Sequence, residues 1–121
     1  MVKTPTRGFR SLNAWQSSYE LTLEIYRATK QFPSEELYAL TSQLQRAAVS
    51  VPANIAEGYE RNHQKEYKQF LYIAKGSLGE IETHLMLARD LGYLNNSDYD
   101  NIEERRSRTA RLLIGLIRSL A

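Results

Sequence analysis

Apolar residues recur every three or four positions in four long stretches of this chain, and short polar segments separate the stretches. This spacing places the apolar side chains on one side of an α-helix, so it predicts helices at about residues 12–32, 35–59, 62–91 and 98–120. The third stretch carries the clearest seam, at heptad spacing. The seam consists of Tyr67, Leu71, Ala74, Leu78, Ile81, Leu85 and Ala88.

The segments between the predicted helices are short, which forces consecutive helices to lie side by side and to run in opposite directions. We therefore predict an all-α fold, an antiparallel up-and-down four-helix bundle. It forms a single domain over residues 9–121, preceded by a mobile basic tail at residues 1–8.

Local signals place the helix ends. Pro33 is expected to end the first helix, because proline biases its predecessor away from helical dihedrals. Ser34 is a candidate N-cap for the second helix, and Gly92 is suited to the left-handed conformation that ends the third. Ser97 followed by Asp100 resembles a capping box at the start of the fourth helix.

Pro52 lies inside the second predicted helix. Proline lacks an amide hydrogen and crowds the carbonyl four residues back, so we expect a kink there. The helix is expected to continue, because Val51 and Ile55 stay in phase with the apolar stripe. Gly58 is expected to help end it.

The composition excludes several classes of protein. The chain has 121 residues and no cysteine, which rules out disulfides, thiolate zinc sites and cysteine nucleophiles. No stretch approaches 18 apolar residues, and the first residues lack the apolar region of a secretory signal. We expect a cytoplasmic location and no membrane contact.

The sequence offers no complete catalytic or metal site. The only imidazoles are His63 and His84, with no Gly-x-Ser-x-Gly turn, and His84 is expected to be a hydrogen-bonded bundle histidine. Glu60 and His63 have the spacing of a di-iron motif, but they straddle a helix junction and have no second copy. We therefore expect no catalytic residue, no metal and no cofactor, and the protein is expected not to be an enzyme.

A polar band runs along the second helix beside the apolar stripe, with partners expected on the third. One interpretation is that these side chains satisfy one another and the backbone near Pro52. The other is a polar site for a ligand or a subunit. The band consists of Gln43, Arg46, Ser50, Asn54, Glu57, Ser77 and Glu80.

Basic residues gather on helix faces that point away from the predicted core. A positive stripe that includes an aromatic ring can follow a phosphate backbone and stack a base. Glutamates are interspersed and the net charge is only +2, so a merely solvated face is the alternative interpretation. The candidate nucleic-acid-binding residues are Arg61, Lys65, Lys68, Tyr72, Lys75, Arg105, Arg106, Arg108 and Arg111.

The apolar side of the first helix is wider than the ~100° stripe that a helix of a monomeric bundle needs. An oligomer would bury the excess. An oligomer would also multiply each basic patch and add valency.

Three stretches, at residues 8–33, 40–61 and 65–94, resemble the bacterial four-helix-bundle proteins called 23S rRNA intervening-sequence proteins. The middle stretch is the most specific, because a helix reading S-V-P-A-N-I-A-E-G is not a generic bundle sequence. Ala39 and Glu60 depart from the family pattern, which usually has Gly and a small residue there. The chain is also similar, more loosely, to the accessory protein of diversity-generating retroelements.

The resemblance implies an up-and-down bundle that assembles into a homopentameric ring. It implies no catalytic residue, and it marks most of the polar band as characteristic of the family. Nucleic acid is the usual suggested partner, and the retroelement relative works with a reverse transcriptase. Two functional hypotheses follow: an oligomeric ribonucleoprotein accessory factor that binds RNA or DNA backbones, or an adaptor that binds another protein without nucleic acid.

Overall fold

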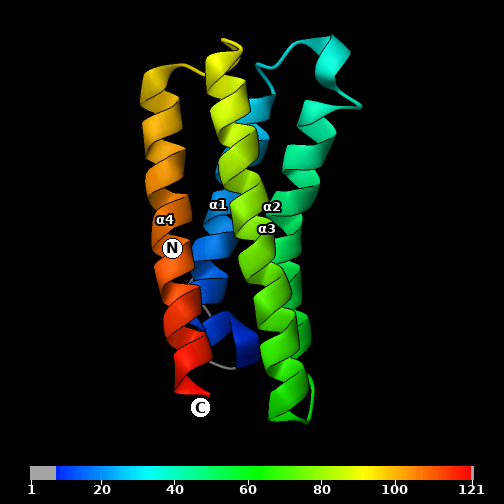
Figure 1. The fold of residues 1–121 in the computed structure, drawn as a ribbon, viewed down its shortest axis with the longest axis vertical. Helices are drawn as coiled ribbons and strands as arrows, with labels where there is room; N and C mark the ends of the chain where they lie inside the picture. Colours follow the sequence, from blue (N-terminus) through cyan, green and yellow to red (C-terminus); the bar gives the residue numbers. More distant parts are fainter. Residues whose placement is uncertain (1–7, 121) are drawn as a thin grey trace, which may run out of the picture.

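The computed structural model describes residues 8–120, and that part of the chain is helical with no strand. Its elements are the 3-10 helix η1 (Gly8–Ser11), α1 (Asn13–Thr29), the 3-10 helix η2 (Ser34–Glu36), α2 (Leu40–Tyr59), α3 (Gln64–Asp90) and α4 (Asn96–Ser119). Figure 1 shows the four long helices side by side, with each connection at the opposite end from the one before. The predicted all-α class and four-helix bundle are confirmed.

Each long helix packs against its neighbours in the chain, and α4 packs back against α1 to close the bundle. No helix in the described part of the chain is long and apolar enough to cross a membrane. Of the expected tail, residues 1–7 lie outside the described range, and Gly8 already belongs to η1.

The core follows the predicted seam. Every seam residue of α3 from Leu71 to Ala88 is buried, and Tyr67 is half-buried. Leu21 and Ile25 of α1 and Leu113 of α4 face them from the other helices. This interior also contains a polar contact between α1 and α4.

The polar contact joins α1 to α4. The hydroxyl oxygens of Ser17 and Thr109 lie 2.6 Å apart, and both side chains are buried. The Thr109 hydroxyl also donates to the carbonyl oxygen of Arg105, 2.8 Å away. Both buried hydroxyls therefore have hydrogen-bond partners, as buried polar groups require.

Two of the predicted helix starts are wrong. Ser34 does not cap α2: it begins η2, and α2 starts only at Leu40, whose amide donates to Oε1 of Glu36 (3.3 Å). At α4 the cap is Asn95, whose Oδ1 accepts from the amide of Asp98 at 2.7 Å. An Asx cap two residues earlier therefore replaces the predicted Ser97 capping box.

The helix ends are better predicted at α3 than at α1. Gly92 has φ +82°, and the amide of Tyr93 reaches the carbonyl of Ala88 at 2.9 Å, which completes a Schellman motif. The Tyr93 hydroxyl then donates to Glu36, and this bond raises the pKa of Tyr93. By contrast α1 ends at Thr29, before Pro33 could act on it.

α2 continues through Pro52, as the apolar pattern predicts. Because proline has no amide hydrogen, the carbonyl of Ala48 loses its partner within the helix. The hydroxyl of Thr22 on α1 lies 3.0 Å from that carbonyl oxygen and donates to it, sharing its hydrogen with the carbonyl of Ser18. The neighbouring helix therefore satisfies the acceptor that Pro52 leaves open, while the kink itself stays a prediction.

Thr22→Val is expected to destabilise the protein by about 1–2 kcal/mol, because it leaves the Ala48 carbonyl without a donor. In a Pro52→Ala background the new amide at position 52 supplies that donor, and the same Thr22→Val change should then cost less than about 0.5 kcal/mol. Urea unfolding of the four proteins in this double-mutant cycle measures both values. Equal costs in the two backgrounds would contradict this account of Thr22.

The prediction that Gly58 helps end α2 is wrong: the helix runs on to Tyr59, and Gly58 instead lies in a tight contact with α3. A Cβ atom at position 58 would lie 2.9 Å from Cβ of Phe70 and 3.1 Å from the carbonyl oxygen of Tyr67. Both atoms are fixed to the α3 backbone and cannot swing aside. Glycine is required here by packing, while the helix runs on to Tyr59.

Gly58→Ala should therefore destabilise the bundle by about 1–2 kcal/mol, since overpacking outweighs the gain in helix propensity. Gly76→Ala on α3 is the matched control, because nothing lies within 4 Å of a Cβ atom there. That change should stabilise the protein by about 0.5–1 kcal/mol. Thermal or urea unfolding that gave both changes the same sign would disprove the tight contact.

Candidate nucleic-acid interface

One line of side chains on the outer face of α3 combines positive charge with an aromatic ring. Lys65, Lys68, Tyr72 and Lys75 are spaced by three, four and three residues, so they are neighbours along the helix surface. Tyr72 is exposed, between Lys68 and Lys75. We call these four residues the α3 stripe.

The charges of the α3 stripe are not neutralised within the bundle. Among residues 8–120, no carboxylate oxygen lies within 4.0 Å of the amino groups of its lysines. Each ammonium group therefore remains available for a phosphate. The stripe extends about 15 Å along the helix, at 1.5 Å per residue.

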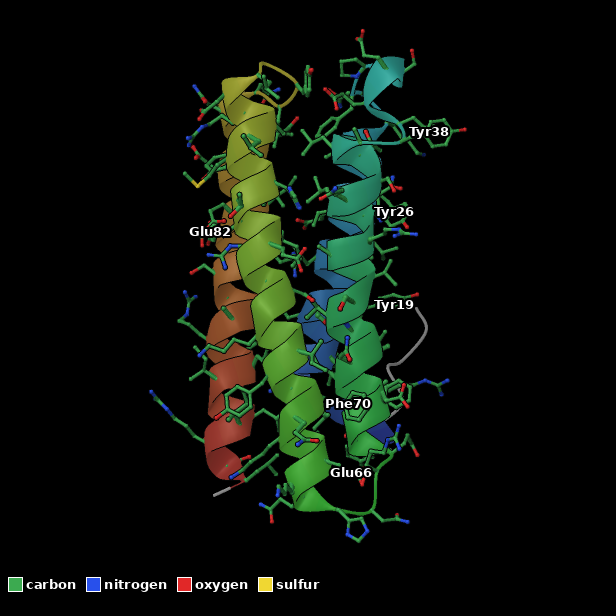
Figure 2. The ribbon with its side chains drawn as sticks, turned by 45° about the vertical axis from the view of Figure 1, so that its right-hand side comes forward. Tyr19, Tyr26, Tyr38, Glu66, Phe70 and Glu82 are labelled. Carbon is green, nitrogen blue, oxygen red and sulfur yellow. The ribbon has the colours of Figure 1, made fainter. Side chains whose placement is uncertain are left out.

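Arg61 has a different environment, although the sequence groups it with the stripe. Its guanidinium lies 3.0 Å from Glu57 and 3.7 Å from Glu66, and it stacks over the ring of Phe70 at 4.9 Å. Figure 2 shows Glu66 and Phe70 at the same end of the bundle. Exposed ion pairs of this kind are weak, so Arg61 is partly neutralised but still accessible.

The α4 arginines divide into two groups. Arg106 is buried, only 9% exposed, and pairs with Glu103 (2.7 Å) and Glu82 (3.3 Å). The hydrogen bond to Glu103 raises the pKa of Arg106. The prediction that Arg106 lies on an outer face is wrong. Its buried side chain pairs with Glu82 of α3 and so joins α4 to α3, where a phosphate cannot reach it.

A sequence signal for this position did exist. Ile102, Arg106, Thr109 and Leu113 follow one another at spacings of four, three and four, which is the buried side of α4. Because we grouped the α4 arginines by their charge, we overlooked the position of Arg106 in this buried pattern.

The remaining α4 arginines lie further round the helix. Arg105 pairs with Glu24 of α1 at 2.8 Å, which neutralises it. Arg108 and Arg111 are exposed, and the Arg111 guanidinium donates to the hydroxyl of Ser107 at 2.9 Å. Arg108 lines the α1–α4 surface with Arg105 and Glu24, so this second basic area does not continue the α3 stripe.

The polar band is partly structural and partly exposed. Ser77 donates to the Ser50 hydroxyl at 2.8 Å, and the Asn54 amide donates to the same oxygen at 2.9 Å, which joins α2 to α3. Glu57 instead pairs with Arg61. The other members, Gln43, Arg46 and Glu80, line a groove of about 410 Å³ between the two helices.

Tyr38 also lines this groove and was not predicted as a site residue. It is 93% exposed, in the segment between η2 and α2 that the sequence assigns to the second helix. The sequence contains one indication of this role, because Tyr38 is an aromatic residue outside the apolar stripe. Assigning Tyr38 to the second helix led us to overlook it.

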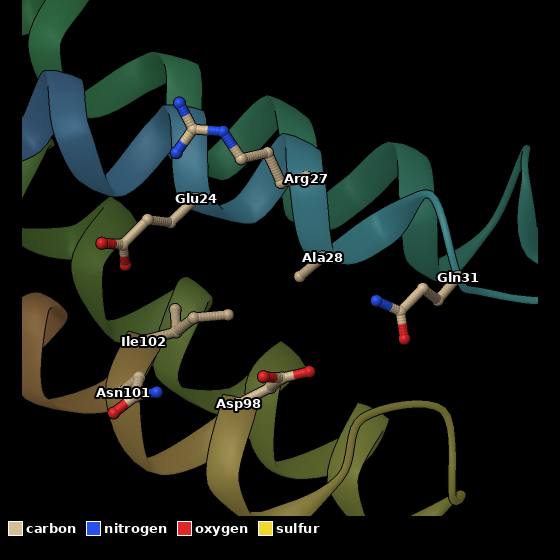
Figure 3. Close-up of a pocket in the computed structure, with 7 residues that line it drawn as sticks. All are labelled: Glu24, Arg27, Ala28, Gln31, Asp98, Asn101 and Ile102. Atoms are coloured by element: carbon tan, nitrogen blue, oxygen red, sulfur yellow. The ribbon is translucent and has the colours of Figure 1, made fainter.

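A second hollow, of about 280 Å³, lies between α1 and α4 and is drawn in Figure 3. Glu24 and Asp98 line it with carboxylates, Gln31 and Asn101 with amides, and Arg27 with a guanidinium group. The Oε2 atom of Glu24 is buried and has no hydrogen-bond partner in the described part of the chain. Two carboxylates against one arginine give the hollow a net negative lining, which does not favour phosphate, so it lies outside the candidate interface.

Among residues 8–120, no three histidine, aspartate or glutamate side chains group closely enough to hold a metal ion. His84 differs from expectation, because its buried Nδ1 has no hydrogen-bond partner there.

The fold and its exposed charges define a small four-helix-bundle protein with basic outer helix faces. The family model described as the 23S rRNA-intervening sequence protein matches residues 10–115, and the chain belongs to that family. A solved structure from Bacteroides thetaiotaomicron, a protein of unknown function from the S23 ribosomal protein family, is similar with a TM-score of 0.80. It is 25% identical, over 86% of this chain and 97% of that one. No curated protein matches the chain.

Proposed function

We propose that this protein is a non-enzymatic, oligomeric accessory factor that binds the phosphate backbone of nucleic acids. The observation that carries the proposal is the α3 stripe, whose lysines have no carboxylate partner within residues 8–120 while the other basic clusters are partly neutralised. An aromatic ring between lysines adds a surface on which a base can stack. These features support contact with single strands without a fixed sequence preference along the stripe.

Assembly is part of the proposal, because the bundle leaves two separate apolar strips in water. One strip lies along α1 and includes Tyr19 and Tyr26, which are 47% and 41% exposed. Figure 2 shows them along one edge of the bundle, with Tyr38 beyond them, and Glu82 on the opposite side. The other strip lies near the C-terminal end of α3, where Leu87 and Leu91, four residues apart, are exposed.

Two different apolar strips favour a head-to-tail contact between copies, in which the α1 strip of one subunit covers the α3 strip of the next. Contacts of this kind close into rings when the rotation allows it. A ring would present one α3 stripe per subunit to the same strand, which raises the overall affinity through valency.

Fluorescence anisotropy with a labelled single-stranded RNA, over a potassium chloride series, tests the proposal. Three lysine contacts per subunit predict that log K falls with log salt at a slope of about −2 for each engaged subunit. Light scattering on the same samples reads the assembly state. Affinity that does not change with salt, or no binding at low salt, would overturn the nucleic-acid function, and capture of a protein partner in that case would favour an adaptor.

A further inference from the structure

The groove between α2 and α3 has a fixed polar floor. Ser77 is buried, and the chain of hydrogen bonds from Ser77 to Ser50 and from Asn54 to Ser50 holds that floor in place. The groove holds about 410 Å³, which is enough for a single planar ring system. Its walls come from two different helices and carry different chemistry.

The two walls present opposite hydrogen-bonding groups. Arg46 on the α2 wall offers only donors, and Glu80 on the α3 wall offers only acceptors when it is ionised. Both side chains are exposed, and neither has an ion-pair partner within 4.0 Å among residues 8–120. They line the same groove without forming a pair with each other, so a ligand between them can contact both.

A flat ligand would also find an aromatic surface at this groove. Tyr38 lines it from the segment before α2, and almost the whole of its side chain is in water. Exposed aromatic rings of this kind stack bases from unpaired strands.

Guanine matches these groups better than the other bases. Its N7 and O6 acceptors lie side by side and suit a bidentate arginine. Its N1–H and exocyclic N2 amine lie side by side on the adjacent edge and suit a bidentate carboxylate. Adenine, cytosine and uracil each offer at most a single donor group beside their acceptors, so they leave one wall incompletely satisfied.

We infer that this groove binds an unpaired guanine of a single-stranded nucleic acid, with Arg46 on N7 and O6, Glu80 on N1–H and the N2 amine, and Tyr38 stacked on the ring. The inference rests on the proposed function and adds a base preference to it. Position also supports it: Glu80 follows Lys75 of the α3 stripe by five residues, a rise of about 7.5 Å along the helix. A strand held on the stripe can therefore place a nearby base in the groove.

Binding of three labelled uridine heptamers tests the inference, one with a central guanosine, one with a central adenosine and one with uridine throughout. At one fixed low salt concentration, the wild-type protein should bind the guanosine heptamer about tenfold more tightly than the other two. Tyr38→Ala should weaken the guanosine heptamer most, since only that heptamer places a base against the ring.

Glu80→Gln gives the sharpest readout, because its effects should have opposite signs. Removing a negative charge beside a polyanion should leave affinity for the all-uridine heptamer equal or slightly higher, whereas the guanosine heptamer should lose at least about fivefold. The matched control is Glu20→Gln on α1, an exposed carboxylate that makes the same charge change. It should leave the guanosine preference intact.

The outcomes separate the two proposals. Equal binding of the three heptamers by the wild-type protein, or a Glu80→Gln change that affects all three alike, would overturn the guanine site and leave backbone binding standing. Failure of every heptamer to bind at low salt would overturn both.

Discussion

Replacing Lys65, Lys68 and Lys75 together with glutamine is expected to weaken binding of single-stranded RNA by about a hundredfold at moderate salt. Each lysine that contacts a phosphate releases a counterion, so the loss of three contacts should reduce the slope of log K against log salt by about 2. The change should not unfold the bundle, because these side chains contribute no ion pair among the described residues. Anisotropy titrations over a salt series measure both quantities.

The matched control removes the same charge elsewhere. Arg27→Gln on α1, Lys30→Gln just after its end and Arg118→Gln on α4 replace three exposed basic residues. If affinity depended only on net charge, the two triple variants would weaken binding equally, and that result would contradict the α3 stripe. A large loss in the stripe variant alone would support it.

Introducing Tyr19→Glu and Tyr26→Glu together is expected to convert the assembly into single subunits. Each new carboxylate would have to be buried without a partner at the contact between copies, which costs several kcal/mol. Within one subunit both side chains are substantially exposed, and glutamate favours helices more than tyrosine does. Light scattering should therefore report a smaller particle while circular dichroism remains helical.

Ser97→Glu and Ser119→Glu on α4 form the control, because both positions are exposed and lie outside the two apolar strips. That variant should keep the wild-type mass. A wild-type protein that is already a single subunit at high concentration would refute assembly, and the tyrosine variant would then behave like the control. RNA affinity should fall in parallel with assembly, since separate subunits lose the gain from valency.

The arrangement of the fold was predictable because periodicity reports burial directly. The heptad seam of α3 identified six residues from Leu71 to Ala88, and all are buried. Helix starts were harder, because local capping signals compete. Asn95 and Ser97 are both acceptable caps for α4 in sequence, and only Asn95 caps it. At α2 the start moves past Ser34 to Leu40, whose amide donates to Glu36, and the same carboxylate accepts from Tyr93 of a distant segment.

The candidate site was only partly predictable. The sequence shows which residues are charged, but their availability depends on how each helix is rotated against its neighbours. The spacing of Arg106 with Ile102, Thr109 and Leu113 does indicate the buried side of α4, but no local pattern shows that Arg105 meets Glu24 of α1 or that Arg106 meets Glu82 of α3. Lys65, Lys68 and Lys75 stay free because the outer face of α3 has no neighbouring helix.

The buried hydroxyl pair between Ser17 and Thr109 has a consequence for how the bundle chooses one packing arrangement. Apolar side chains tolerate a slip of α4 along α1 by one helical turn, about 5.4 Å, because leucines can interdigitate again after such a shift. The hydroxyl of Ser17 cannot, since a slipped α4 would leave it buried without its Thr109 partner, while Thr109 keeps only its bond to Arg105 within α4. The pair therefore fixes the axial position of α4 along α1, and with it the position of the outward arginines of α4 relative to α1.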